Sequence, residues 1–181
     1  RRCLEPIKWY DNVPVLSYLL LGRRCRACKA VIPLRYPLVE LLTAGLALAV
    51  LAASFEPRLA ILMFALGAAL LVVTFIDIDH RIIPDAITLP SILVGPAAAF
   101  VLGHISVTDS LAGIVVGGGI LWLVATLYEK LRGREGMGMG DVKLLAMIGG
   151  MLGLQGALFT LLLSSVAGAT AGLVLVAAKR T

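Results

Sequence analysis

The chain has 181 residues, of which 60% are hydrophobic and 15% are charged, and its formal net charge is +5. Soluble domains are usually close to half apolar, so this composition and the long uncharged runs indicate a polytopic membrane protein. Nucleic-acid binding is disfavoured, because the basic residues flank apolar stretches and are not interleaved with aromatic residues. The first residues show no signal-peptide pattern.

Residues 1–36 precede the first apolar stretch and contain all three cysteines of the chain, Cys3, Cys25 and Cys28. Cys25 and Cys28 form a C-x-x-C motif. A structural Zn²⁺ usually takes four ligands, often from two such pairs, and here only three cysteines are available. Three thiols without a metal are an alternative, and a redox C-x-x-C is disfavoured because no βαβ pattern surrounds it.

Six apolar stretches follow, and a helix needs about 20 residues to cross a bilayer. They cover roughly 37–55, 58–76, 86–103, 111–128, 142–153 and 156–178. We therefore predict an all-α fold, a polytopic membrane helical bundle of about six spans over 37–181, with residues 1–36 as a small loop domain. The fifth stretch is too short unless it includes Lys143 or the glycine-rich segment before it. The fourth stretch suits close helix packing through its glycines, which are Gly113, Gly117, Gly118 and Gly119.

The basic residues are distributed unevenly between the two sides of the predicted bundle. All but one of the 16 Lys and Arg residues fall on one side, and the exception is Arg58. The positive-inside rule predicts that the basic side is cytoplasmic. Asp77, at the end of the second stretch, and Asp141, at the start of the fifth, then lie on the cytoplasmic side at one membrane depth.

The segment TFIDIDHRIIPD places Asp77, Asp79 and Asp85 at the end of an apolar run. Acidic residues at membrane depth are costly and usually functional, and Asp77 is the deepest. Residues two apart on a helix point in different directions, so Asp77 and Asp79 cannot both face one partner. Pro84 ends or kinks the helix, and Asp85 is placed to cap the next one. For Asp79 and Asp85 an ordinary solvated loop is an equal alternative.

Two carboxylates within a few ångström of each other share a proton. One can act as general base on a water, while the other, protonated, polarises a scissile carbonyl. We predict that Asp77 and Asp141 form such a pair. A Ser–His pair is disfavoured because His80 and His104 fall on opposite sides of the predicted membrane. The alternative for Asp141 is that it caps the fifth helix.

The segment GMGMGD ends at Asp141 and contains Gly136, Gly138 and Gly140. Glycine lets another backbone approach closely, so these residues would allow a peptide to lie beside the aspartate, although a flexible loop is the alternative. An ion channel or transporter could also use paired aspartates, but no acidic residue continues the path through the membrane. A non-enzymatic scaffold would leave the pair unexplained.

Three segments together resemble one family. GMGD at 138–141 is a GxGD motif, and FIDIDHRIIPD at 75–85 and KWYDNVPVLSYLLLGRRCRACKAVIPLRYPLVE at 8–40 accompany it. The combination resembles the prepilin peptidases, or type IV leader peptidases, a family of GxGD membrane aspartic proteases. The resemblance covers essentially the whole chain, and the three segments together are far more specific than GxGD alone.

The resemblance implies a bifunctional enzyme of the bacterial inner membrane with its active site on the cytoplasmic side. It would cleave the basic leader of type IV prepilins or pseudopilins after a Gly, serving type IV pili or type II secretion. It would then N-methylate the new N-terminus with S-adenosylmethionine. Asp77 and Asp141 would be catalytic, with Gly138, Gly140, Asp79 and Asp85 as substrate-binding residues. Because the leader is basic, its contacts are expected among the acidic residues Glu5, Asp11, Asp79, Asp85 and Glu135.

The resemblance also bears on the cysteines and on Glu40. Family members carry a C-x-x-C pair before the segment at Pro6, and Cys3 matches its second member. Cys3, Cys25 and Cys28 would then bind a structural zinc in a small cytoplasmic loop, with a fourth ligand upstream of Arg1. Glu40 lies in a family motif without an assigned role.

Overall fold

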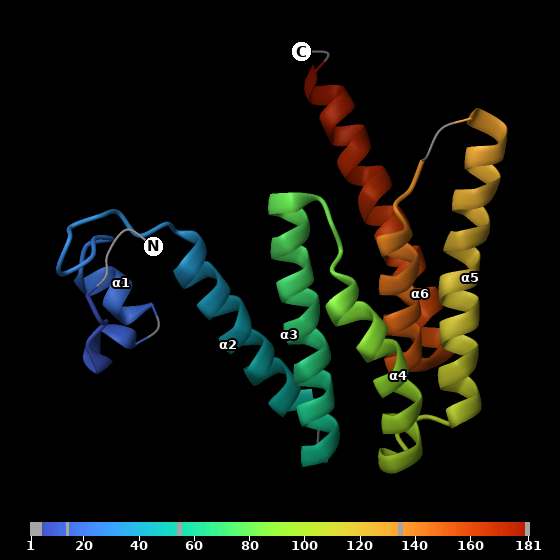
Figure 1. The fold of residues 1–181 in the computed structure, drawn as a ribbon, viewed down its shortest axis with the longest axis horizontal. Helices are drawn as coiled ribbons and strands as arrows, with labels where there is room; N and C mark the ends of the chain where they lie inside the picture. Colours follow the sequence, from blue (N-terminus) through green and yellow to red (C-terminus); the bar gives the residue numbers. More distant parts are fainter. Residues whose placement is uncertain (1–4, 14, 54–55, 134–135, 180–181) are drawn as a thin grey trace. The chain divides into compact units, whose positions relative to one another are not determined.

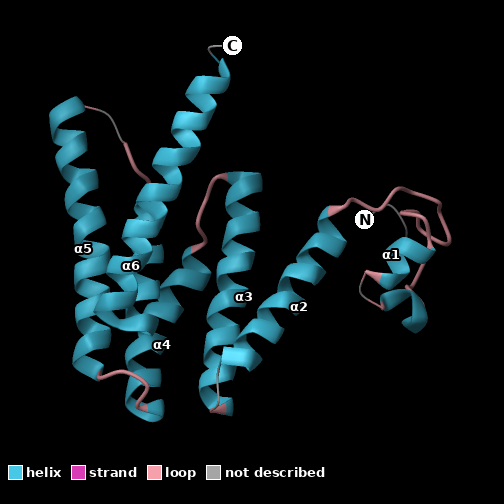
Figure 2. Cartoon of the chain, turned by 180° about the vertical axis from the view of Figure 1, so that it is seen from behind, coloured by secondary structure: helices cyan, strands magenta, loops and turns pink. Residues whose placement is uncertain are grey.

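A computed structural model describes residues 5–13, 15–53, 56–133 and 136–179. Within these ranges the protein is helical and contains no strand, apart from an isolated bridge between Arg24 and Val31 (Figures 1 and 2). The elements are the 3₁₀ helix η1 (Trp9–Asn12) and the α-helices α1 (Leu16–Leu20), α2 (Arg35–Ala53), α3 (Pro57–His80), α4 (Asp85–Leu102), α5 (Val107–Arg132) and α6 (Met139–Lys179). The predicted all-α fold is confirmed.

The five helices α2 to α6 are each long and apolar enough to cross a membrane. This agrees with a multi-pass membrane protein, and it differs from the prediction of six spans in one respect. The predicted fifth and sixth stretches, 142–153 and 156–178, lie in the single element α6.

The helix α6 is broken at Gly153, whose backbone has a φ of 76° and a ψ of −175°. A positive φ is readily adopted only by glycine. Gly117 of α5 lies against both the Leu145 carbonyl and the Ala157 methyl group, although these residues would be about 18 Å apart along a straight helix. The chain therefore folds back at the break (Figure 1, orange to red). We call residues 139–152 the first arm of α6 and residues 154–179 its second arm; they correspond to the two predicted stretches.

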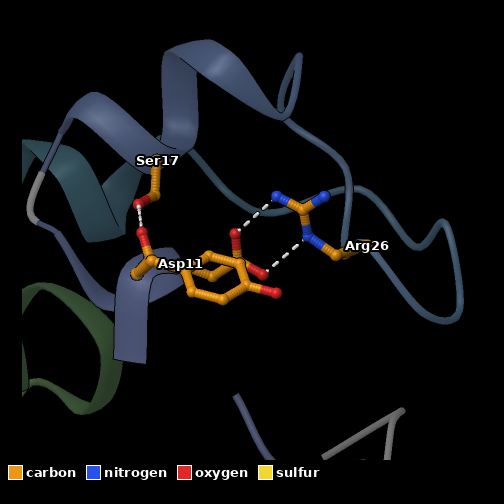
Figure 3. Close-up of polar contacts among 4 residues, drawn as sticks. Asp11, Ser17 and Arg26 are labelled. Carbon is orange, nitrogen blue, oxygen red and sulfur yellow. Dashed lines mark hydrogen bonds and ion pairs between the residues drawn. The ribbon is translucent and has the colours of Figure 1, made fainter. Parts of the chain in front are cut away.

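The described chain forms two compact units, residues 1–71 and residues 72–181. In the first unit, the Arg26 guanidinium donates two hydrogen bonds of 2.7 Å to the Asp11 carboxylate, and the Ser17 hydroxyl donates to the Tyr10 carbonyl at 3.3 Å (Figure 3). These contacts hold η1, α1 and the cysteine-containing turn together in a segment that is otherwise mostly loop.

In the second unit, the first arm of α6 packs closely on both α4 and α5 through glycines. Gly95 of α4 lies against the Gly150 backbone, and Gly113 of α5 lies against Gly149. Glycines without a Cβ let helix backbones approach in membranes. The predicted close packing of the fourth stretch is thus confirmed at Gly113, while Gly119 has no atom within 4 Å of its missing Cβ and does not take part.

The break in α6 exposes backbone groups that a continuous helix would pair. The segment before and at the start of α5 supplies the partners. The Ser110 hydroxyl donates to the Gly150 carbonyl at 2.6 Å, the His104 Nε2 lies 3.1 Å from the Met151 carbonyl, and the Leu154 N–H donates to the Asp109 carboxylate at 3.3 Å. Backbone polar groups inside a membrane must find such partners, so these side chains stabilise the fold-back.

Candidate active site

The first part of the site is the junction between α3 and α4. The helix α3 ends at His80, and the Arg81 N–H still donates to the Asp77 carbonyl at 2.8 Å. Arg81 has a positive φ of 55°, which turns the chain. Pro84 precedes the first residue of α4, Asp85, as expected for a residue that favours a helix start. The sequence predicted that Pro84 ends or kinks a helix; α3 instead ends at His80, four residues earlier, and Pro84 is the N-cap residue of α4.

The second part of the site is the start of α6. The helix begins at Met139, so Asp141 is its third residue rather than its N-cap, and the capping interpretation of Asp141 is wrong. A carboxylate in a first turn is still favoured by the helix dipole. Gly118 of α5 lies against Val142 and Ala146. In space, the start of α6 therefore lies beside the middle of α5 and not beside its C-terminal end.

These two parts line one half-open cavity of about 420 Å³. Its lining consists of Asp77, Arg81, Ile82, Ile83, Asp85, Gly138, Gly140 and Asp141. Asp77 and Asp141, which are far apart in the sequence, therefore lie at one cavity. Asp79 is exposed and is not part of this lining. This agrees with the expectation that Asp77 and Asp79 face different directions.

The three glycines before Asp141 differ in their surroundings. A Cβ on Gly140 would lie 2.8 Å from the Cβ of Ile83, and a Cβ on Gly136 would collide with the ring of Tyr128. These two glycines therefore make room for side chains of this chain. Gly138 has only the Gly140 nitrogen at 3.9 Å. Gly138 is thus the glycine of this segment that leaves open space for another molecule.

Asp85 has a partner that the sequence analysis did not identify. Its two carboxylate oxygens lie 2.7 and 2.8 Å from the Lys143 ammonium. Asp85 is the first residue of α4, and the residue at the N-cap position is Pro84, so the prediction that Asp85 caps α4 is wrong. A lone lysine inside an apolar stretch requires a counter-charge, and that signal was available in the sequence.

In the first unit, Cys25 and Cys28 lie on a tight turn. The Cys25 N–H donates to the Ala30 carbonyl at 2.9 Å, and the Lys29 N–H donates to the Cys25 carbonyl at 3.0 Å. Cys3 lies outside the described residues, and within the described ranges no three metal-binding side chains come together. The described residues thus supply one C-x-x-C pair and no complete set of metal ligands.

Glu40 has a structural contact in the same unit. Its carboxylate accepts a hydrogen bond of 2.8 Å from the Val15 N–H. Val15 has a positive φ of 59°, which is unusual for a β-branched residue. Glu40 of α2 therefore stabilises the strained backbone of Val15, the residue just before α1.

Comparison with known proteins decides the family. Residues 64–173 match the "Type IV leader peptidase family", and residues 1–54 match the "Bacterial Peptidase A24 N-terminal domain". The chain belongs to the type IV leader peptidase family. Asp77, Asp141 and the intervening cavity residues all fall within the first match, and Cys25, Cys28 and Glu40 fall within the second. The resemblance inferred from the three sequence segments is confirmed.

Several type IV leader peptidase relatives align over nearly the whole chain. Proteins named prepilin leader peptidase/N-methyltransferase from Aeromonas salmonicida, Pseudomonas aeruginosa and Neisseria gonorrhoeae are 43%, 42% and 37% identical, over 97%, 96% and 98% of this chain. The chain spans 60%, 60% and 62% of the length of these relatives. No solved structure matches the chain.

Proposed function

We propose that this chain carries the proteolytic centre of a prepilin leader peptidase. The enzyme is an aspartic endopeptidase that removes the basic leader from type IV prepilins or pseudopilins after a Gly. The observation that carries the proposal is that Asp77 and Asp141, far apart in the sequence, line one cavity. The printed names of the relatives support the choice of substrate.

In this mechanism the two aspartates share one proton and hold a water between them. The ionised carboxylate removes a proton from the water, whose oxygen attacks the scissile carbonyl carbon. The protonated carboxyl donates a hydrogen bond to the carbonyl oxygen as negative charge develops there. Collapse of the tetrahedral intermediate breaks the C–N bond, and the departing amine takes a proton from a carboxyl. The open space at Gly138 is where the peptide backbone lies next to Asp141.

In this proposal the site lies at the cytoplasmic side of the inner membrane. The support is the distribution of Lys and Arg, of which all but Arg58 among 16 fall on one predicted side. A prepilin would have its apolar segment in the bilayer and its basic leader in the cytoplasm, which brings the scissile bond to the cavity. Asp79 remains a candidate for contact with the leader, because it is exposed near the end of α3.

A transporter or channel is the alternative for the Asp pair, and it finds less support. A path from the cavity along the first arm of α6 would need polar side chains. The buried residues there are apolar, namely Val142, Leu145, Ala146, Met147 and Ile148. The polar cluster at the other end of the arm is engaged with the break in α6.

The second activity and the zinc site are proposed on narrower grounds. The relatives are named N-methyltransferases, and we assign to this enzyme methyl transfer from S-adenosylmethionine to the new N-terminus, with no residue assigned. Cys3, Cys25 and Cys28 are proposed as ligands of a structural Zn²⁺, supported by the turn that carries Cys25 and Cys28. Zinc content by elemental analysis should fall in Cys25→Ser and Cys28→Ser, and unchanged zinc would reject these ligands.

The decisive experiment measures cleavage of a matching prepilin by purified protein in detergent. Asp77→Asn and Asp141→Asn should each lower kcat by about 10²–10⁴-fold or more, the range for loss of general acid–base catalysis. Glu129→Gln, an exposed acidic residue of α5 outside the cavity, is the matched control and should cleave normally. If either aspartate variant cleaves at a near wild-type rate, the pair is wrongly assigned and Asp79 becomes the next candidate.

A further inference from the structure

The contact between Asp85 and Lys143 joins the two halves of the candidate site. Asp85 is the first residue of α4 and lines the cavity. Lys143 lies two residues beyond Asp141 in the first arm of α6. The Lys143 ammonium lies 2.7 and 2.8 Å from the two Asp85 oxygens, so both oxygens of that carboxylate face one cation.

This ion pair is not well placed to stabilise the fold. The side chain of Lys143 is 31% exposed and that of Asp85 is 55% exposed. Ion pairs as accessible to water as this one contribute little to folding stability. The close backbone contacts of Gly95 and Gly113 already hold the first arm against α4 and α5. The role of the ion pair therefore lies in the geometry and charge of the cavity.

The charged groups lining the cavity are Asp77 from α3, Arg81 from the α3–α4 loop, Asp85 from α4 and Asp141 from α6. A proton shared by Asp77 and Asp141 requires that no further uncompensated carboxylate stand beside them. Lys143 supplies the compensating charge for Asp85. It also links the start of α4 to the turn of α6 that carries Asp141. The α3–α4 loop connects the start of α4 to the end of α3, which carries Asp77.

We propose that Asp85 and Lys143 are positioning residues for the catalytic pair. Their ion pair sets where Asp141 stands relative to Asp77, and it removes Asp85 from the set of residues that bind the basic leader. The inference rests on the proposed peptidase function and deepens it. It replaces the sequence-based assignment of Asp85 as a leader contact with a role that acts through Asp141.

The test separates positioning from leader binding by steady-state kinetics with one prepilin. Asp85→Asn and Lys143→Gln should each lower kcat by about 10–100-fold, the cost of a displacement of about 1 Å at a reacting group, with little change in KM. The double variant should be no worse than either single one, because both changes remove one interaction. Exchange of the two residues, Asp85→Lys with Lys143→Asp, should recover part of the lost kcat, and Lys143→Arg should retain most of it.

Lys130→Gln and Glu129→Gln on α5 are matched controls, since both residues are exposed and lie outside the cavity lining. Thermal unfolding should be close to wild type in Asp85→Asn and Lys143→Gln, which excludes misfolding as the cause. A rise in KM for Asp85→Asn alone, abolished when the leader's basic residues are neutralised, would overturn the proposal in favour of leader binding. Strictly additive losses in the double variant would overturn it as well.

The outcomes distinguish failure of this inference from failure of the proposed function. If Asp77→Asn and Asp141→Asn are inactive while Asp85→Asn and Lys143→Gln have wild-type kcat, the catalytic pair stands and the positioning role falls. If the Asp77 and Asp141 variants remain active, the proposed function itself is wrong.

Discussion

Gly113 of α5 and Gly149 of α6 lie backbone to backbone, and a Cβ on either residue would collide with the carbonyl of the other. The contact lies in the first arm of α6, two helical turns after Asp141. A side chain added at either glycine would displace that arm, because the nearest atoms belong to the backbone of the other helix. The position of Asp141 therefore depends on two residues that touch neither the cavity nor a substrate.

The substitution Gly113→Ala should lower the thermal unfolding temperature and the cleavage rate together. Forcing a methyl group into a closely packed contact costs about 1–3 kcal/mol. Gly119→Ala on the same helix is the control, because nothing lies within 4 Å of that position; it should be neutral or slightly stabilising, since alanine favours helix by up to about 1 kcal/mol. Equal stability of the two variants would show that α5 and α6 are not in backbone contact at Gly113.

Gly138→Ala and Gly140→Ala should fail for different reasons. The methyl group in Gly140→Ala would meet Ile83 at 2.8 Å, so the loop or the helix must shift, with a lower unfolding temperature and lost activity. Gly138→Ala meets no side chain, so the protein should unfold at the wild-type temperature while prepilin cleavage becomes weaker. Normal cleavage by Gly138→Ala would mean that the peptide does not lie against this residue.

Ser110→Ala should destabilise the fold-back of α6. Ser110 is fully buried, and its hydroxyl donates to the Gly150 carbonyl at 2.6 Å. Leaving a buried acceptor unpaired costs about 1–3 kcal/mol. Thr126→Ala is the comparison, because the exposed Thr126 hydroxyl bonds only to carbonyls within its own helix. Thermal unfolding in detergent should separate the two variants, and equal unfolding temperatures would contradict the structural role of Ser110.

The contact between Asp11 and Arg26 should weaken in acid. The hydrogen bonds from the Arg26 guanidinium lower the pKa of the Asp11 carboxyl; desolvation opposes this, and the charges of Arg26 and Lys8 add to it. Since the folded pKa lies below the unfolded one, the contact contributes its stability above the unfolded value of about 3.9. That contribution is lost as the pH falls through the lower, folded pKa.

The fluorescence of Trp9 reports on this loop, because its ring lies 5.6 Å from that of Tyr10, over which the Arg26 guanidinium lies. The chain has two tryptophans, so Trp122→Phe isolates the signal. We expect an emission change below about pH 4 that disappears in Asp11→Asn and persists in Glu5→Gln. High salt should reduce it, since the Arg26 side chain is 54% exposed. A change that survives Asp11→Asn would assign the transition to another group.

The sequence was informative wherever a local pattern constrains a long-range contact. Asp77 and Asp141 each follow from their place at the end of an apolar stretch, and the positive-inside rule brings both to one depth. The glycines of the fourth stretch similarly predicted close packing. The helical fold could be derived in this way because the membrane permits few alternatives for the backbone, whereas the family came from the resemblance of three sequence segments.

Other features depend on which distant segments of the chain come together in space, and a local sequence pattern does not reveal this. Whether Gly138 or Gly140 is open is decided by where Ile83 lies, and Ile83 is far from both in the sequence. The pairing of Lys143 with Asp85 likewise requires the start of α4 to lie beside the start of α6. The cap assignments failed because helix starts shift by one or two residues with tertiary context.

The first arm of α6 is short for a membrane-spanning segment. Residues 139–152 rise by about 21 Å as a helix, whereas the hydrocarbon layer is about 30 Å thick. Both ends of the arm are polar, with the cavity at one end and His104, Asp109 and Ser110 at the other. Local thinning of the bilayer is one way in which a membrane accommodates so short a segment. A substrate helix that diffuses into the thinned zone has more apolar length than the lipid there can cover. In the proposed mechanism, the residues at its cytoplasmic end would then reach water, so the scissile bond would be exposed before it meets Asp77 and Asp141.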